Sequence, residues 1–467
     1  MPALRQIRVP YTPRLWGRGL AVLLLCAATA ARAHIGSPDT FVQANAGPYT
    51  VLLSVHPPTA YPGAAQVELR AADITSATVA LGASAPQPLQ SSGPGVYTAS
   101  LWTPTSAAHF LHLRLTGEQG TGALDLTLPA NPAAASPTPN RNRELFFLFA
   151  LLLALLAIAI AITSRKPLGR IAALAIAIAA AALCVFALRT PRSSVPATQL
   201  AATLNSTGML HLTLTNPHES FLDLVPDDGK LLHLFLIRQP RLDLLIHLHP
   251  TQEKVPNQFD VQLPVMPSGA YSLYADLYHA TGVEDTATLN LDLPGQSTSP
   301  TPLAGDDSVG SAAPISAAAP RPEPIPLPSG QLSRTAHLLD GYTMQLTTAA
   351  GIQQIHPHTA QLLTVTLLDP AGQPAKDMAL YLGMPAHAVV YRADGGVFAH
   401  IHPGGTLPMT SMPVMNLDAM STMSTAEPVP ATATIPYGFP SPGLYRLFIQ
   451  MRHSKVVETA AFDLNVQ

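Results

Sequence analysis

One histidine pattern occurs twice in the second half of the chain. In each occurrence a single histidine precedes a His-x-His-Pro phrase: His233 with His247 and His249, and His387 with His400 and His402. Each occurrence continues through a Gly-x-Tyr step to one more histidine, His279 in the first and His453 in the second. Repetition over this length indicates a duplicated module. Imidazole is the commonest metal ligand in proteins, so the module is a candidate metal binder.

Spacing within the pattern favours a shared metal ion. Residues at i and i+2 of a strand point to the same face, so both imidazoles of a His-x-His phrase can bind one ion. We expect Leu245 or Phe398 on the same face as the histidine pairs. His233 or His387 would complete the site from the preceding strand, and His279 or His453 from the penultimate strand. Buried histidines that only hydrogen-bond one another or the backbone remain the alternative.

A methionine-rich insertion separates the two halves of the second occurrence. Five of the twelve methionines of the chain lie in it: Met409, Met412, Met415, Met420 and Met423. Thioether is a soft ligand that suits Cu(I). The alternative is a flexible loop whose methionines are only compositional.

The N-terminus has the features of a secretory signal peptide, residues 1–33. Four arginines precede an apolar stretch, residues 20–30, and Ala31-Arg32-Ala33 fits a cleavage site. Cleavage there would leave His34 at the N-terminus, where its amine and imidazole could chelate copper. The alternatives are an uncleaved anchor and a His34 that is merely exposed. An oxidative copper enzyme built on His34 is a third, weaker hypothesis for function.

Two uncharged apolar runs within residues 144–190 predict two transmembrane helices. Residues 145–163 and 171–188 approach the ~20 residues that span a bilayer. The basic connection, residues 164–170, is expected in the cytoplasm. Residues 34–144 and 189–467 would then lie outside the cytoplasmic (inner) membrane and face the periplasm. The two cysteines, Cys26 and Cys184, fall in the signal peptide and in the second apolar run.

The remaining segments read as strands, with short alternating runs between turn residues that are typical of β-sandwiches. We therefore predict an all-β fold of three immunoglobulin-like sandwiches plus a two-helix transmembrane hairpin. The expected segments are an exported sandwich (34–130), a linker (131–143), the first repeat (197–296), a Pro/Ser/Ala linker (297–330), disordered or extended, and the second repeat (331–467).

The repeated phrases resemble a known family. Residues 230–238 with Ile246-His-Leu-His-Pro, and residues 381–387 with Phe398-Ala-His-Ile-His-Pro, are similar to YtkA-like (FixH-related) exported domains. The resemblance implies immunoglobulin-like sandwiches of bacterial envelopes that are often associated with copper handling. The first copy lacks the methionine insertion, so the two copies need not be equivalent.

Composition narrows the function further. A net charge of −3 gives no basic surface for nucleic acid, and no catalytic motif is present, so we expect no enzyme. We predict a membrane-anchored envelope protein that binds copper as a chaperone, buffer or sensor. Its partners would be a metal ion, the lipid bilayer and an envelope protein. The alternative is an immunoglobulin-like structural or interaction protein of the envelope that binds no metal.

Overall fold

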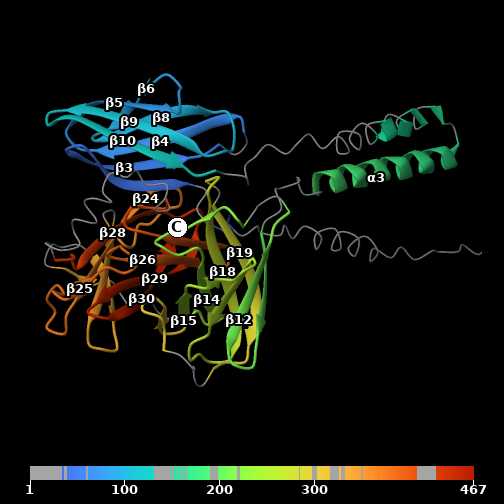
Figure 1. Ribbon diagram of the computed structural model, residues 1–467. Helices are drawn as coiled ribbons and strands as arrows, with labels where there is room; N and C mark the ends of the chain where they lie inside the picture. Colours follow the sequence, from blue (N-terminus) through green and yellow to red (C-terminus); the bar gives the residue numbers. More distant parts are fainter. Residues whose placement is uncertain are drawn as a thin grey trace, which may run out of the picture.

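The structure is a computed structural model dominated by β-sandwich-like sheets (Figure 1). It describes residues 34–35, 39–58, 61–130, parts of 149–166, 167–189, 198–217, 221–282, 284–296, 302–315, 325–327, 332–348, 351–407 and 428–467.

The first sandwich packs a five-stranded sheet on a four-stranded one. The sheet orders are β2-β3-β4-β8-β7 and β10-β9-β5-β6. The strands are β2 (Thr40–Ala46), β3 (Tyr49–His56), β4 (Gly63–Ala71), β5 (Ile74–Leu81), β6 (Gln87–Pro88), β7 (Gln90–Gly93), β8 (Val96–Thr103), β9 (His109–Gly117) and β10 (Gly120–Leu128). Alternate residues such as Val67 and Leu69 point into its core, as the period of two in a strand requires.

The first copy of the repeat is a continuous sheet that folds over its own core. Its order is β16-β17-β12-β11-β19-β18-β14-β15-β20, with β13 beside β18. The strands are β11 (Gln199–Leu204), β12 (Met209–Thr215), β13 (Leu224–Val225), β14 (His233–Gln239), β15 (Leu244–Leu248), β16 (Thr251–Gln252), β17 (Gln258–Gln262), β18 (Gly269–His279), β19 (Glu284–Leu293) and β20 (Ser308–Ser311).

The second copy consists of two facing sheets. One has the order β1-β27-β26-β29-β25 with β30 beside β29, and the other has the order β21-β22-β23-β24-β28. The strands are β1 (His34–Ile35), β21 (Ile325–Pro326), β22 (Leu332–His337), β23 (Thr343–Thr348), β24 (Ala360–Leu368), β25 (Met378–Ala379), β26 (His387–Arg392), β27 (Val397–Ile401), β28 (Thr432–Gly438), β29 (Gly443–His453) and β30 (Val456–Val466).

The strands that carry the histidines have the same order in both copies. The first copy has β15-β14-β18-β19, and the second has β27-β26-β29-β30. Register agrees as well, because His233 lies opposite Asp276 and His387 lies opposite Gln450. The sequence repeat is therefore also a structural repeat.

The segment between the copies, predicted to be a disordered or extended linker over residues 297–330, contains two short strands among its described residues, 302–315 and 325–327. β20 pairs antiparallel with the edge strand β15, and β21 pairs with β22. An edge strand leaves backbone N–H and C=O groups unpaired, so a passing segment gains hydrogen bonds by adding to it. The Pro- and Ser-rich composition of residues 297–330 did not prevent these short strands from forming.

The two copies dock through the outer faces of their histidine-bearing sheets. Side chains from both copies form one apolar cluster: Phe235, Ile237, Leu242, Leu245 and Tyr274 with Val389, Tyr391, Phe398 and Phe448. The rings of Tyr274 and Phe398 stack with centroids 4.0 Å apart. Strands β14, β15, β26 and β27 are consequently buried on both faces, which explains their near-continuous apolar sequences.

Residues 144–190 contain one complete described helix, α3 (Pro167–Arg189), and helical positions between 149 and 163. Across the described positions of the chain, no helix is both long and apolar enough to cross a membrane. The structure therefore does not show the predicted hairpin of two transmembrane helices. Several positions of both apolar runs fall outside the description.

Replacing Phe398 with Ala tests the docking of the copies. Phe398 is 1% exposed and contacts residues of both copies. Truncation of a buried Phe costs about 3–5 kcal/mol because a cavity remains. We expect the midpoint of urea unfolding to fall accordingly. Phe110→Ala is the control, since Phe110 is 63% exposed and should cost little. Equal effects of the two changes would contradict this packing.

Candidate metal centre

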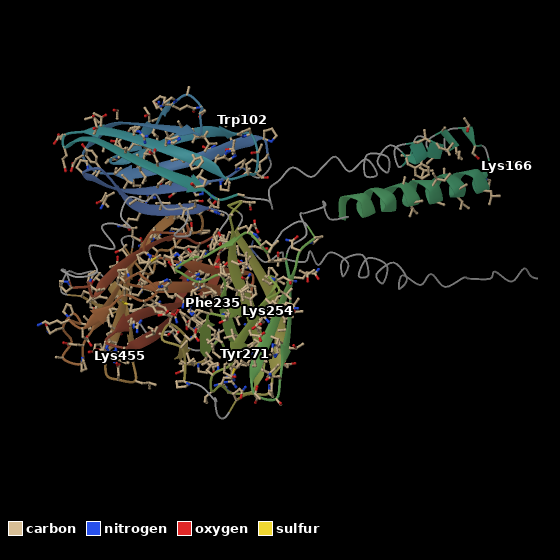
Figure 2. All side chains as sticks on the ribbon, viewed as in Figure 1. Trp102, Lys166, Phe235, Lys254, Tyr271 and Lys455 are labelled. Atoms are coloured by element: carbon tan, nitrogen blue, oxygen red, sulfur yellow. The ribbon has the colours of Figure 1, made fainter. Side chains whose placement is uncertain are left out.

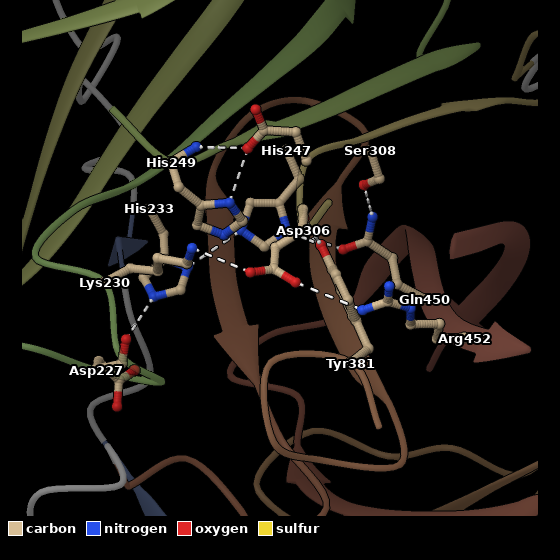
Figure 3. A network of polar contacts seen from close by, with 11 residues as sticks. Asp227, Lys230, His233, His247, His249, Asp306, Ser308, Tyr381, Gln450 and Arg452 are labelled. Carbon is tan, nitrogen blue, oxygen red and sulfur yellow. Dashed lines mark hydrogen bonds and ion pairs between the residues drawn. The ribbon is translucent and has the colours of Figure 1, made fainter. Parts of the chain in front are cut away.

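Six histidines meet where the two copies dock, three from each copy. The first-copy triad is His233, His247 and His249, and the second-copy triad is His387, His400 and His402. His400 joins them, with its ring centroid 5.1 Å from that of His233 and 5.8 Å from that of His247. In five of the six the whole residue is at most 7% exposed, and the side chain of His249 is 5% exposed. Figure 2 shows the side chains of the whole molecule, and Figure 3 shows the first-copy triad.

Strand periodicity places these rings. In the first copy Phe235 lies opposite His247, so both point to the outer face. Their neighbours Leu234, Leu236 and Ile246 point inward to the core of the first copy. His233 and His249 follow the same period of two and join the outer face. The second copy repeats this arrangement, with Val389 opposite His400.

Each ring of the first-copy triad uses one nitrogen to donate a hydrogen bond to an oxygen. His233 donates from Nε2 to the carbonyl oxygen of Asp227 (3.0 Å). His247 donates from Nδ1 toward Oε1 of Gln450 (3.0 Å) and the hydroxyl oxygen of Tyr381 (3.1 Å). His249 donates from Nδ1 to the carboxylate of Asp307 (2.9 Å). These oxygens fix the tautomer of each ring, as partners of metal-bound histidines do (Figure 3).

The opposite nitrogens of the rings are consequently left without protons. Nδ1 of His233 and Nε2 of His247 face one another at 3.1 Å, and Nε2 of His249 is buried without a hydrogen-bond partner among the described residues. Two imidazole nitrogens that bind one tetrahedral ion at about 2.0–2.1 Å lie roughly 3.3 Å apart. The facing lone pairs repel one another, and a cation between them would turn that repulsion into attraction.

The second-copy triad also brings two imidazole nitrogens together, but only His387 among its rings donates to an oxygen at hydrogen-bond distance among the described residues. Nε2 of His400 lies 3.2 Å from Nε2 of His402. His387 donates from Nε2 to the carboxylate of Asp228 (2.8 Å), which leaves its Nδ1 buried and without a partner in the described part of the chain. The same Asp228 oxygen lies 3.3 Å from Nε2 of His402, and a carboxylate oxygen of Asp276 lies 3.5 Å from Nδ1 of His400.

Each triad is therefore supported by the other copy. Asp228 and Asp276 of the first copy face the second-copy triad, whereas Tyr381 and Gln450 of the second copy face the first-copy triad. Gln450 is itself fixed, because its Nε2 donates to the hydroxyl of Ser308 in β20. Neither triad has its full set of contacts without both copies.

Burial favours the neutral form of five of the six imidazoles. Burial, with the neighbouring imidazoles, lowers the pKa of His233 to about 3. Burial lowers the pKa of His402 to about 4 and the pKa values of His247 and His400 well below 6.5. Burial also lowers the pKa of His249, against the effect of Asp307. A neutral imidazole is the form that binds metal.

The carboxyl groups beside the second-copy triad behave oppositely to one another. Burial would raise the pKa of Asp228, but His402 and His387 outweigh it and lower the pKa to about 2. Burial raises the pKa of Asp276 to about 7. Asp228 is therefore a permanent buried negative charge beside His387 and His402.

His279 and His453 do not join the six-histidine cluster. They end β18 and β29 and pair with carboxylates instead, His279 with Asp223 (2.9 Å) and His453 with Asp377 (3.2 Å). Burial would lower the pKa of His279, but Asp285 and Asp223 outweigh it and raise the pKa to about 9. His453 has ligand atoms near those of Asp340 and Glu458, in a group that is partly exposed.

The other candidate ligands fall elsewhere. Met409, Met412 and Met415 lie outside the described residues, as does the rest of the methionine insertion. The backbone of His34 pairs with Val397 through β1, at the edge of β27. His56, in the first sandwich, pairs with Asp39 at 3.1 Å.

Sequence reasoning missed the groups around the triads: Asp228, Asp276, Asp307, Tyr381 and Gln450. Asp228 lies in a tight hairpin, where Asp is ordinary, and Asp276 and Gln450 lie in strands. One signal was available in the sequence: Asp276 and Gln450 are polar residues at equivalent positions of two otherwise apolar strands. In the structure they lie opposite His233 and His387, respectively.

One family model matches most of the two copies. The family is described as a domain of unknown function, DUF8832, and the match covers residues 194–294 and 336–467, just under half of the chain. These residues are similar to that family. No curated protein matched the chain.

Three solved structures illustrate the level of structural similarity that the comparison found. A tetra-tandem repeat from the extending region of a large adhesion protein is 7% identical with a TM-score of 0.17, over 87% of this chain and 97% of that one. The ICAM-5 D1–D4 ectodomain fragment is 10% identical with a TM-score of 0.16, over 90% and 77%. Salmonella alpha-2-macroglobulin is 8% identical with a TM-score of 0.19, over 94% and 24%. Likeness at this level concerns β-sandwich-like architecture alone.

The metal-free protein should lose stability in acid. Five histidines with lowered pKa values bind protons in the unfolded chain below pH 6.5 but stay neutral in the folded one, so the free energy of unfolding falls as the pH decreases from about 6.5 toward 4. Asp276 and Glu284, whose pKa values burial raises, act in the opposite direction but are outnumbered. Each uncompensated histidine contributes about 1.4 kcal/mol per pH unit.

Urea unfolding of the metal-free chain between pH 7 and pH 4.5 measures this dependence. His247→Gln should reduce the slope by about one proton, because one buried base is removed. A stability that is flat over this range would contradict the buried, neutral cluster.

Proposed function

We propose that the protein binds copper at the six-histidine cluster between its two repeats. One observation carries the proposal: Nδ1 of His233 and Nε2 of His247 face one another at 3.1 Å, while the opposite nitrogen of each ring already donates to an oxygen. In the tautomers that these oxygens favour, neither facing nitrogen carries a proton, and a cation between them would bind both. A second approach of two imidazole nitrogens, at 3.2 Å, joins His400 and His402, but Nδ1 of each ring has no hydrogen-bond partner among the described residues.

Copper is favoured by the ligand set. Imidazole suits copper, zinc, iron and nickel, and among divalent ions of the first row copper binds such sites most tightly. Magnesium and calcium prefer oxygen ligands, which a triad of imidazoles does not supply. The resemblance of the repeated phrases to YtkA-like domains, a prediction from sequence, also favours copper.

Among the three predicted roles of chaperone, buffer and sensor, the burial of the histidines favours a buffer that stores the ion. A chaperone that hands its ion to a partner keeps a ligand within reach of that partner, whereas these imidazoles are almost inaccessible. Release of an ion requires separation of the two docked copies, which share an apolar cluster. We therefore propose slow exchange and a binding role without catalysis.

The proposal places the protein in a bacterial envelope, anchored to the cytoplasmic membrane and facing the periplasm. Its support is the sequence: the signal-like N-terminus, the apolar runs within residues 144–190 and the family resemblance. Immunoglobulin-like character of the three sandwiches and Cu(I) capture by Met409, Met412 and Met415 are proposed on the same basis.

Variants of the full chain test copper binding. His247→Ala with His400→Ala removes one ligand from each triad, and equilibrium dialysis against Cu(II) should show bound copper falling to background, because the proposed methionine site takes Cu(I). His112→Ala is the control, because His112 lies on the first sandwich and pairs with Asp125 at the surface. Near-ultraviolet circular dichroism checks folding. The proposal fails if the parent binds no copper or if the double variant binds as much as the parent.

A further inference from the structure

The two triads occupy equivalent places in their copies but have different charged neighbours. Hairpin 227–230 of the first copy corresponds to hairpin 381–384 of the second, since each is closed by the same backbone bridge and carries a positive φ at its second residue. Asp228 (φ 49°) thus corresponds to Leu382 (φ 51°). By the same equivalence Asp227 corresponds to Tyr381, and Asp276 corresponds to Gln450.

Docking directs all three acidic side chains to the second-copy triad. Carboxylate oxygens of Asp227 and Asp228 and a nitrogen of His402 all lie within 4.8 Å of one another. Asp228 also contacts His387, and Asp276 approaches His400 at 3.5 Å. Oδ1 of Asp228 and Oδ2 of Asp276 are buried without hydrogen-bond partners among the residues that the structure describes.

The corresponding neighbours of the first-copy triad are uncharged. Tyr381 and Gln450 contact His247 through a hydroxyl and an amide oxygen. One carboxylate, Asp307, contacts this triad, through His249. Lys230 lies in the same region and pairs with Asp306 at 3.1 Å (Figure 3).

We propose that the cluster holds two copper ions of different charge, Cu(I) at the first-copy triad and Cu(II) at the second-copy triad. The inference rests on the proposed copper binding. A buried charge is costly unless opposite charge compensates it. Three neutral imidazoles leave a monovalent ion with one positive charge, which suits a site with one carboxylate. A divalent ion needs the additional negative charge that Asp228 and its neighbours supply.

The basicity of the imidazole ligands also favours Cu(II) at the second-copy triad. A carboxylate that accepts a hydrogen bond from a metal-bound imidazole makes that imidazole a more basic ligand. Asp228 does this for His387, whereas an amide, Gln450, accepts from His247. More basic nitrogen ligands stabilise the more highly charged ion, and weaker ones leave the soft Cu(I) state favoured.

Separate loading of the full chain with Cu(I) under anaerobic conditions and with Cu(II) in air tests the inference. Competition with a chromophoric chelator measures both affinities, and electron paramagnetic resonance counts Cu(II). We expect one tight Cu(II) per chain. Asp228→Asn should weaken Cu(II) binding by about 10–100-fold, the usual effect of losing such a supporting group, and should leave the tightest Cu(I) site within about twofold. Gln450→Glu, which places a carboxylate at His247, should add a second tight Cu(II).

The outcomes separate this inference from the proposed function. If no copper binds, both fail. If loading with Cu(I) and then with Cu(II) gives one ion in total per chain, or if Asp228→Asn weakens Cu(I) and Cu(II) equally, two inequivalent sites are excluded and copper binding stands. If Asp228→Asn does not fold, Gln450→Glu decides, since it should add a second tight Cu(II) without removing charge beside the second-copy triad.

Discussion

The apposition of unprotonated imidazole nitrogens in a dry interior is the constraint on which the rest of the structure depends. His233 and His247 each donate from one side to an oxygen, and their remaining lone pairs meet at 3.1 Å. The histidines are buried, because the surrounding aromatic and aliphatic side chains come from both copies. Under the proposed function a cation would stabilise this arrangement, and metal binding would then be linked to docking of the copies.

Duplication supplies the means of burying the site. A single sheet has one face for its own core, and its other face would expose His247 with Phe235 and Leu245. Placing two such faces together covers both and brings the hairpin of each copy to the histidines of the other. The same docking turns a difference between the copies into a difference between the two triads, because Asp228 contacts His387 and Asp276 approaches His400, both of which belong to the other copy.

The histidines and their faces could be predicted from sequence, since the period of two in a strand places His247 and His249 together with Leu245. Repetition also predicted the shared strand order. Docking could not be predicted, because it depends on contacts between residues with no local relation, such as Tyr274 with Phe398. His279 and His453 were expected in the site from their place on the penultimate strand. They lie at its far end, where Asp223 and Asp377 hold them.

X-ray absorption at the copper edge of the loaded full chain tests the central claim most directly, because it identifies the atoms bound to the ion. The account predicts nitrogen scatterers in the first shell with the outer-shell signature of imidazole rings, about three rings per ion. A first shell of sulfur or of water oxygen without imidazole, in a chain that binds copper, would contradict a metal centre at the six histidines.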